Sequence, residues 1–186
     1  MAKIGVFLAD GFEEIEGLAV VDILRRAGVE VTMISIMKRN EVHGAHAITV
    51  LADALYEEVD FAKLDGVVLP GGMPGTTNLG AHDGVKEQIA EFASAGKLVA
   101  AICAAPGVLG ENGILKGKKA ACYPGVEEKL LGAEVTFEEV AEDGNIITSR
   151  GMGTAIPFAL SLTKYLTEEK KVEKLADAIV YKTSLQ

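Results

Sequence analysis

The sequence predicts an α/β fold, a doubly wound three-layer sandwich in which helices cover both faces of a mostly parallel sheet. Short apolar runs alternate along the chain with longer segments of helical periodicity. The run Leu98–Ile102 is apolar at every position, which is typical of a central strand buried on both faces. The first strand, helix and strand together occupy residues 3–36, a length that suits a right-handed parallel crossover.

That first crossover unit is clearly delimited. Residues 3–9 form an apolar strand that ends at Asp10. Residues 14–27 carry apolar side chains three and four positions apart, which predicts a helix, and Gly28 ends it. Residues 29–36 supply the second strand.

The middle of the chain is expected to hold a hairpin, a strand and a helix. Residues 42–51 alternate weakly and suit a small antiparallel hairpin. Residues 67–69 form a strand that runs into Gly71 and Gly72, a loop whose backbone can approach a ligand closely. Residues 85–95 place their apolar side chains on one helical face.

The C-terminal half continues the alternation. Strands are expected near residues 119–122, 134–137 and 145–149, and helices over residues 104–109, 154–166 and 169–181. Ligands of such sheets bind at the carboxyl ends of the strands. We therefore expect residues 10–16, residues 71–73 and Cys103 to converge at one edge of the sheet.

Composition and charge exclude several classes of function. The 186 residues include 27 acidic and 18 basic side chains, a net charge of −9, and this balance argues against a nucleic-acid or anionic-membrane partner. With 49% hydrophobic residues, the chain is too apolar to be disordered. No repeat or linker interrupts it, so we expect a single domain over residues 1–186.

The sequence holds no pattern of a membrane span or a secretory signal. Its longest nearly apolar run, residues 98–110, is shorter than the roughly 18 residues that cross a bilayer, and it contains Pro106. The apolar stretch between Lys3 and Asp10 is too short for a signal peptide. We expect a cytoplasmic protein in which Cys103 and Cys122 are both reduced.

Cys103 is the candidate nucleophile. It stands where the buried strand turns toward a helix, and the small neighbours Ala101, Ala104 and Ala105 permit the tight turn of a nucleophile elbow. A helix N-terminus and nearby amides stabilise a thiolate, which predicts a lowered pKa for this thiol. The alternative is that Cys103 is only a small buried hydrophobe.

Backbone amides close to Cys103 are candidate oxyanion donors. The loop at Gly71 and Gly72 offers N–H groups at the end of a parallel strand, and the Ala104 amide is the second donor. The alternative for the two glycines is an ordinary tight turn.

Three acids, Glu13, Glu14 and Glu16, open the first helix. Acidic side chains are favourable at any helix N-terminus, which explains them without chemistry. One of them, beside the thiol at a strand end, would nevertheless be desolvated. Burial would raise the pKa of that carboxyl and let it hold or donate a proton.

The remaining motifs imply neither a cofactor nor a metal. The glycine-rich loop lacks both the Lys-Ser/Thr ending of a phosphate-binding loop and the dinucleotide spacing. His43, His46 and His82 match no metal-site spacing, and we expect them at the surface. Cys122 is expected to pack as a small apolar residue, with a resolving thiol for Cys103 as the alternative.

Five ordered blocks resemble the motifs of the ThiJ/PfpI superfamily, in particular of its DJ-one (YajL-like) branch. They are GFEEIE at 11–16, VDILRRAG at 21–28, VVLPGG at 67–72, AAICAAP at 100–106 and TSRGMGT at 148–154. The resemblance implies a flavodoxin-like sandwich, usually a homodimer, with a readily oxidised nucleophile at Cys103. It places the family's protonated glutamate on Glu16 and the oxyanion-type amides on Gly72 and Ala104.

The same resemblance implies three activities: cofactor-free conversion of methylglyoxal or glyoxal to a hydroxy acid, repair of early glycation adducts, and a chaperone or oxidative-stress role. The expected partners are therefore a small aldehyde or dicarbonyl substrate and a second copy of the chain, with Arg25 and Arg26 as interface candidates. A different class of function, a redox sensor or chaperone without catalysis, would use the same Cys103 through oxidation to sulfinic acid.

Two departures from the family pattern narrow the expected chemistry. The protease-like branch carries a histidine directly after its cysteine, whereas this chain has Ala104, so the Cys-His dyad is missing and a protease is not expected. A histidine that is common near the thiol in the DJ-one branch is here Tyr123, whose phenol, with a pKa of about 10, is a poor base at neutral pH. Proton transfer then depends on Glu16 or water, with Tyr123 and Gly71 as pocket walls.

Overall fold

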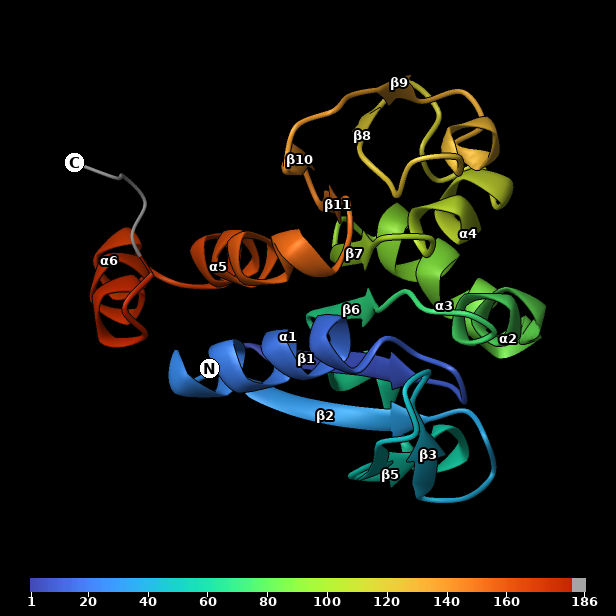
Figure 1. The fold of residues 1–186 in the computed structure, drawn as a ribbon, viewed down its shortest axis with the longest axis horizontal. Helices are drawn as coiled ribbons and strands as arrows, with labels where there is room; N and C mark the ends of the chain where they lie inside the picture. Colours follow the sequence, from blue (N-terminus) through green and yellow to red (C-terminus); the bar gives the residue numbers. More distant parts are fainter. Residues whose placement is uncertain (182–186) are drawn as a thin grey trace.

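A computed structural model describes residues 1–181, and a seven-stranded sheet forms its centre (Figure 1). The strands follow the order β10-β11-β7-β6-β1-β2-β5. Neighbouring strands are parallel except β10, which is antiparallel to β11. The mostly parallel α/β fold that the sequence predicts is therefore confirmed.

The elements alternate along the chain as expected. The strands are β1 (Lys3–Leu8), β2 (Glu30–Ser35), β3 (Glu41–His43), β4 (Thr49–Leu51), β5 (Ala54–Leu55), β6 (Gly66–Leu69), β7 (Leu98–Ile102), β8 (Lys119–Ala120), β9 (Glu134–Val135), β10 (Val140–Asp143) and β11 (Ile146–Ser149). The helices are α1 (Glu14–Arg26), α2 (Gly75–Ala81), α3 (Asp83–Ser94), α4 (Pro106–Glu111), α5 (Ala155–Leu166) and α6 (Glu169–Ala178). Short 3-10 turns are η1 (Tyr56–Glu58), η2 (Phe61–Lys63), η3 (Glu127–Lys129) and η4 (Met152–Thr154).

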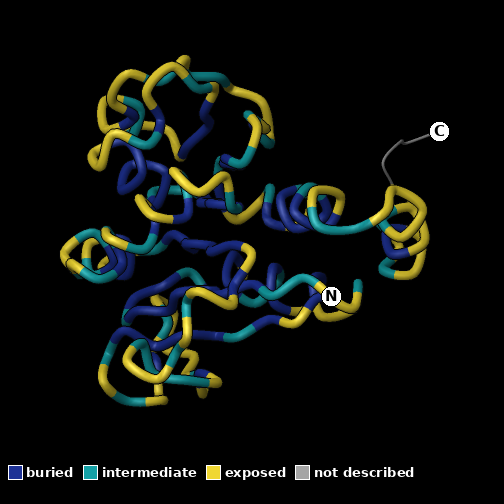
Figure 2. Tube along the Cα trace, turned by 180° about the vertical axis from the view of Figure 1, so that it is seen from behind, coloured by how far each residue is buried: buried dark blue, intermediate teal, exposed yellow. Residues whose placement is uncertain are grey.

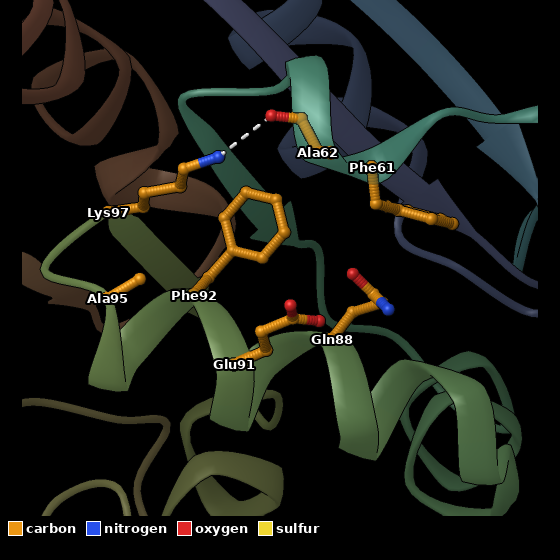
Figure 3. A pocket seen from close by; sticks show the side chains of 7 residues that line it. All are labelled: Phe61, Ala62, Gln88, Glu91, Phe92, Ala95 and Lys97. Carbon is orange, nitrogen blue, oxygen red and sulfur yellow. Dashed lines mark hydrogen bonds between the residues drawn. The ribbon is translucent and has the colours of Figure 1, made fainter.

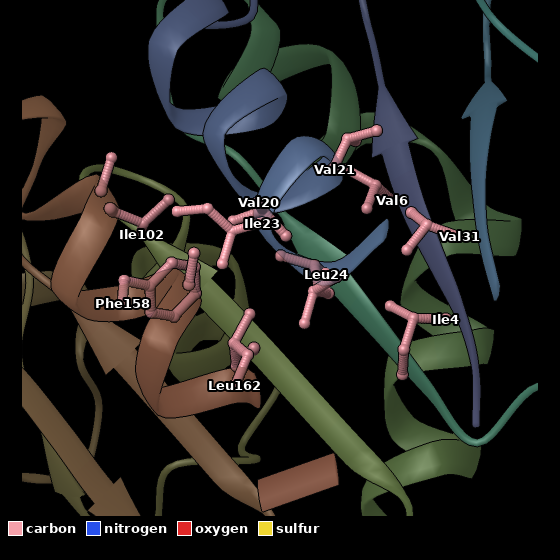
Figure 4. Packing of buried hydrophobic residues seen from close by; sticks show 14 of the residues in the cluster. Ile4, Val6, Val20, Val21, Ile23, Leu24, Val31, Ile102, Phe158 and Leu162 are labelled. Atoms are coloured by element: carbon pink, nitrogen blue, oxygen red, sulfur yellow. The ribbon is translucent and has the colours of Figure 1, made fainter. Parts of the chain in front are cut away.

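Alternate side chains of each central strand enter two separate hydrophobic cores. In β7, Ala100 and Ile102 face the core that α1 and α5 cover, while Val99 and Ala101 face the core that α3 and α4 cover. Figure 4 shows the first core, in which Phe158 of α5 meets the apolar side of α1. Buried stretches follow the strands through the middle of the molecule, and exposed stretches lie in the surrounding loops (Figure 2). Burial on both faces explains why this strand is apolar throughout.

The structure differs from the sequence prediction mainly where local signals are weak. Helix α2 was not expected, because its sequence GTTNLGA holds poor helix formers, and the buried Leu79 anchors it to the second core. The edge strands β5 and β10 were also missed. The segments expected as strands near residues 119–122 and 134–137 pair with each other as β8 and β9, outside the large sheet.

Two helix boundaries also need correction. Helix α4 begins at Pro106 and not at residue 104, because proline suits the first turn, where its missing N–H is not needed. Helix α6 ends at Ala178, three residues before the expected end at 181. Within residues 1–181, no helix has both the length and the apolar composition that a membrane span requires.

Candidate active site

Three neighbouring strands end at the same edge of the sheet and bring the candidate residues together. Strands β7, β6 and β1 are adjacent and parallel, and they are followed by Cys103, by Gly71 and Gly72, and by the loop that leads to Glu16 in α1. These positions are far apart in the sequence. Their convergence follows from the parallel topology, as the sequence analysis expected.

Cys103 has a left-handed backbone conformation, with φ of 65°. Its N–H donates to the Ser149 carbonyl at 3.0 Å, and its own carbonyl accepts the Tyr123 N–H at 2.8 Å. These two hydrogen bonds hold the residue from β11 and from the loop after β8. A left-handed conformation is costly for a residue other than glycine and persists where the surroundings enforce it, as at a nucleophile elbow.

The Glu16 carboxyl lies buried against the Cys103 thiol. Only 1% of Glu16 is exposed, and its Oε2 accepts the Gly71 N–H at 2.8 Å. Its Oε1 makes no conventional hydrogen bond within residues 1–181, and the Cys103 thiol interacts with this carboxyl. Burial raises the pKa of Glu16 to about 7, an effect that the Gly71 and Cys103 hydrogen bonds only partly offset. The carboxyl is therefore able to hold a proton near neutral pH.

Burial also raises the pKa of the Cys103 thiol, to about 12, and the charge of Glu16 and its hydrogen bond add to the rise. The amides of Ala104 and Gly72 act in the opposite direction but less strongly. The lowered pKa that the sequence analysis expected is therefore wrong for this arrangement. Helix α4 begins only at Pro106, so Cys103 lies outside its first turn and the helix dipole does not offset the burial.

The thiol and the carboxyl therefore titrate as a pair. The first proton leaves the pair near pH 7, and the second is held to much higher pH. When Glu16 carries the remaining proton, its charge no longer opposes the thiolate and its O–H can donate to the sulfur. One negative charge shared by sulfur and carboxyl is the state that can attack an electrophile.

The loop after β6 requires glycine at both of its first two positions. A Cβ on Gly71 would lie 2.6 Å from both the Cys103 Cβ and the Glu16 Oε2. Gly72 has φ of 92°, and a Cβ there would lie 2.3 Å from the Glu13 nitrogen. The missing side chains let the Gly71 amide reach Glu16 and the Gly72 amide reach the sulfur.

A cavity of about 380 Å³ lies near Cys103, which does not itself line it, and its lining includes Ala104, the next residue in the chain, and Tyr123, whose N–H donates to the Cys103 carbonyl. Tyr123 is 53% exposed and stands at the cavity wall, where the sequence analysis placed it. Gly71 does not line this cavity. Gly71 was expected to form part of the pocket wall. Its backbone instead lies against Cys103 and donates a hydrogen bond to Glu16.

The other candidates have structural roles. Cys122 is buried in the second core, and burial raises the pKa of its thiol to about 11, so it packs as expected for a small apolar residue. His82 caps the start of α3, and its Nδ1 accepts the Val85 N–H at 3.2 Å. His43 Nδ1 lies 3.0 Å from the Thr49 hydroxyl across the hairpin.

His46 is exposed, as the sequence analysis expected, but its contact with Glu14 was missed. Glu14 is buried, and its two oxygens meet the His46 N–H at 2.7 Å and the ring Nδ1 at 2.9 Å. The Glu13 carboxylate lies 3.5 Å from the same ring nitrogen. Nothing in the spacing signals this cluster, because it forms only when the β3–β4 hairpin folds back on the start of α1. It ties the hairpin to the helix.

A second cavity, of about 260 Å³, lies between α3 and η2 and is lined by none of the site residues (Figure 3). Lys97 crosses it, donates to the Ala62 carbonyl at 3.1 Å and lies 5.0 Å from the centre of the Phe92 ring. These contacts fasten α3 to the turn that precedes β6. This second cavity is therefore separate from the site around Cys103.

The fold and the site together define an α/β protein with a cysteine in a left-handed conformation after a buried strand, a buried carboxyl beside the sulfur and two backbone amides near it. The chain belongs to the DJ-1/PfpI family, whose profile matches residues 2–165.

Individual relatives agree with this assignment. The chain is 38% identical over 177 residues to protein dj-1beta of Drosophila melanogaster, covering 94% of this chain and 95% of that protein. It is 34% identical over 167 residues to a Pyrococcus abyssi protein named as a deglycase, covering 88% of this chain and 99% of that protein. The structure of oxidized Toxoplasma gondii DJ-1 superposes with a TM-score of 0.93 at 34% identity, covering 97% of this chain and 99% of that one.

Proposed function

We propose that this protein is a cysteine-dependent, cofactor-independent enzyme that converts small α-dicarbonyls to hydroxy acids, with methylglyoxal as the model substrate and lactate as its product. The observation that carries the proposal is the buried Glu16 carboxyl against the Cys103 sulfur, with the pKa of that carboxyl raised to about 7. A group that changes its protonation near neutral pH suits proton transfer during turnover. The name of the Pyrococcus abyssi relative supports carbonyl chemistry of this kind.

The proposed reaction balances without an external oxidant. The Cys103 thiolate adds to the aldehyde carbon of methylglyoxal, and the resulting oxyanion takes the proton held by Glu16, which gives a hemithioacetal and leaves Glu16 as a carboxylate. The hydrogen on that carbon leaves as a proton to Glu16, and an enediol forms. Return of the proton to the neighbouring carbon gives a thioester of lactic acid, which water hydrolyses to release lactate and the thiol. The aldehyde carbon is oxidised by two electrons, and the ketone carbon is reduced by the same two.

The backbone amides of Gly72 and Ala104 stabilise the charged states of this sequence. Both amides lower the pKa of the Cys103 thiol, and the proposed oxyanion forms on the carbon bonded to that sulfur, within the field of the same amides. Amides fixed by a glycine turn and by the elbow need no reorganisation when charge develops. Loss of one such donor typically costs about 10²–10³ in rate.

The test is lactate formation from methylglyoxal by metal-free protein in the absence of glutathione. Cys103→Ala is expected to abolish turnover, and Glu16→Gln to reduce it by about 10²-fold or more, the usual contribution of a positioned acid or base. Cys122→Ala is the matched control, because it removes the other thiol from the core and should leave turnover unchanged. Retention of most of the wild-type rate by Cys103→Ala would refute the mechanism.

A second candidate function is a redox sensor or chaperone in which Cys103 is oxidised to sulfinic acid. It is favoured by the same amides and carboxyl, which offer hydrogen bonds to sulfinate oxygens, and by the solved structure of the oxidized Toxoplasma gondii relative. Intact mass after mild peroxide treatment separates the two functions. A stoichiometric gain of two oxygens at Cys103 together with negligible dicarbonyl turnover would favour sensing.

Repair of early glycation adducts and homodimer formation, both implied by the family resemblance, stay predictions. The first is checked by release of free amine from a methylglyoxal-treated peptide, with Cys103→Ala as its blank. The second is checked by sedimentation equilibrium of the purified chain.

A further inference from the structure

The cavity beside the site is much larger than the proposed model substrate. Its volume is about 380 Å³, whereas one water molecule occupies about 30 Å³, so there is room for roughly twelve heavy atoms. Methylglyoxal has only five. A volume of this size lies within the range of cavities that hold metabolite-sized ligands, about 300–1,000 Å³.

Three residues that line the cavity are linked directly to the residues of the site, by sequence or by a hydrogen bond. Ala104 follows the nucleophile, Met73 follows Gly72, and Tyr123 donates its N–H to the Cys103 carbonyl. From there the cavity extends between α2 and α4 toward η3, where Glu111 and Lys129 line it. A substrate bonded to the sulfur and held by the two amides therefore has this space available for the rest of its chain.

One polar group of the cavity has no partner. Thr76 is 9% exposed, lines the cavity, and has a buried hydroxyl oxygen without a hydrogen-bond partner among residues 1–181. A buried hydroxyl that makes no hydrogen bond is destabilising, so such groups are uncommon without a function. The oxygen is covered in the structure without a ligand, so a ligand hydroxyl would satisfy it after the Thr76 side chain rotates toward the cavity that this residue lines.

The charges of the cavity point to an uncharged ligand. Glu111 and Lys129 are its charged lining residues, and their side chains pair with each other at 3.4 Å. The remaining polar groups are the hydroxyls of Thr76, Thr77 and Tyr123, and apolar atoms provide most of the wall. Hydroxyl groups on a carbon chain match this lining better than a phosphate or a carboxylate does.

We propose that this cavity is a specificity subsite for the hydroxylated tail of a sugar-derived α-oxoaldehyde of about six carbons, with the Thr76 hydroxyl as a hydrogen-bond partner of that tail. The proposal rests on the proposed function, because it uses the same reaction at Cys103. Carbons one and two undergo the internal oxidation and reduction described above, and the remaining carbons are unchanged. The product is a six-carbon 2-hydroxy acid.

The experiment compares kcat/KM for 3-deoxyglucosone, a six-carbon α-oxoaldehyde with three hydroxyls, with kcat/KM for methylglyoxal, using the full-length protein. Wild type is expected to favour the longer substrate. Thr76→Val, which exchanges the hydroxyl for a methyl group of the same shape, is expected to lower the ratio of the two values by about 3- to 10-fold, the loss that one neutral hydrogen bond produces. It is also expected to raise Tm by about 2–4 °C, because the unpartnered hydroxyl is gone from the unliganded protein.

A second variant blocks the cavity without threatening the fold. A Cβ at Gly80 meets only the Val108 Cγ2 at 3.4 Å, and Gly80 lies in α2, where leucine is a better helix former than glycine. Gly80→Leu is expected to lower the ratio by about tenfold or more, because the larger side chain occupies space that the tail would need and a displacement of about 1 Å can cost about 10²-fold in rate. Ala81→Leu adds the same side chain at the next, exposed position outside the cavity and serves as the control.

The outcomes separate the two proposals. Turnover of methylglyoxal with a ratio that neither Thr76→Val nor Gly80→Leu changes would overturn the subsite and leave the proposed function standing. A wild-type preference for methylglyoxal would also overturn it. If neither dicarbonyl is consumed, the reaction and the subsite fall together.

Discussion

The Gly71 N–H donates to the Glu16 Oε2 at 2.8 Å, and this hydrogen bond joins the loop after β6 to helix α1 close to the Cys103 side chain. It holds one carboxyl oxygen, while the other oxygen has no conventional partner within the described part of the chain. The carboxyl is thus oriented by its backbone partner and is left able to exchange a proton with the thiol.

The pH dependence of kcat/KM for methylglyoxal should show one ionisation near neutrality. The reactive pair carries one negative charge only after its first proton is lost, and burial raises the pKa of Glu16 to about 7. The rate should therefore rise with pH through about 7 and then reach a plateau, because the second proton is held to much higher pH. In Glu16→Gln only the thiol titrates, so the remaining activity should rise at alkaline pH instead. An unchanged profile in this variant would exclude the coupling.

Glu16→Gln should also change the dependence of stability on pH. The pKa of Glu16 is raised from 4.5 to about 7 in the folded protein, so its contribution to stability is fully present below pH 4.5 and is lost as the pH rises through about 7. The glutamine stays neutral and still has an oxygen to accept the Gly71 N–H. The free energy of unfolding of the variant, relative to wild type, should therefore increase by up to about 3 kcal/mol between pH 4 and pH 8. Urea unfolding at several pH values measures this difference, and a constant difference would contradict it.

Gly71→Ala should damage both the site and the fold. The new Cβ would lie 2.6 Å from the Cys103 Cβ and from the Glu16 Oε2, so the loop must shift and the hydrogen bond to Glu16 must lengthen or break. Overpacking of this kind typically costs about 1–3 kcal/mol of stability. We expect a lower Tm together with a loss of turnover. Gly153→Ala is the matched control, because a Cβ there meets no atom within 4 Å, and equal losses in the two variants would contradict the prediction.

The central sheet and the convergence of the site could be predicted because they depend on signals that are local in the sequence. Apolar runs of strand length, such as Leu98–Ile102, mark strands that are buried on both faces, and parallel topology then places their carboxyl ends together. The peripheral elements could not be predicted in the same way. Helix α2 owes its existence to the packing of Leu79, and a propensity argument contains no information about that packing.

The pKa of Cys103 shows the same limit within the site. Its position after a buried strand indicates an elbow, and φ of 65° agrees with that prediction. The direction of the pKa shift, in contrast, depends on how deeply the thiol is buried, on Glu16 and on where α4 begins. These quantities arise from contacts between distant parts of the chain, so a motif does not contain them.

The β3–β4 hairpin should loosen as the pH rises above neutrality, because His46 joins it to Glu14. The hydrogen bond that the His46 ring donates to the Glu14 carboxylate, followed by the charges of Glu13 and Glu14, raises the pKa of His46 above 6.5. A histidine with a raised folded pKa contributes stability that is fully present below pH 6.5 and is lost as the pH rises through the folded value. NMR titration should show this raised pKa, and hydrogen exchange of the Gly44 and Ala45 amides, corrected for its intrinsic pH dependence, should accelerate over the same range.

Glu14→Gln should return the pKa of His46 toward 6.5, whereas Glu168→Gln, the same change of charge at the start of α6, should leave it where it is. A His46 pKa that both variants leave unchanged would show that Glu14 does not hold the hairpin.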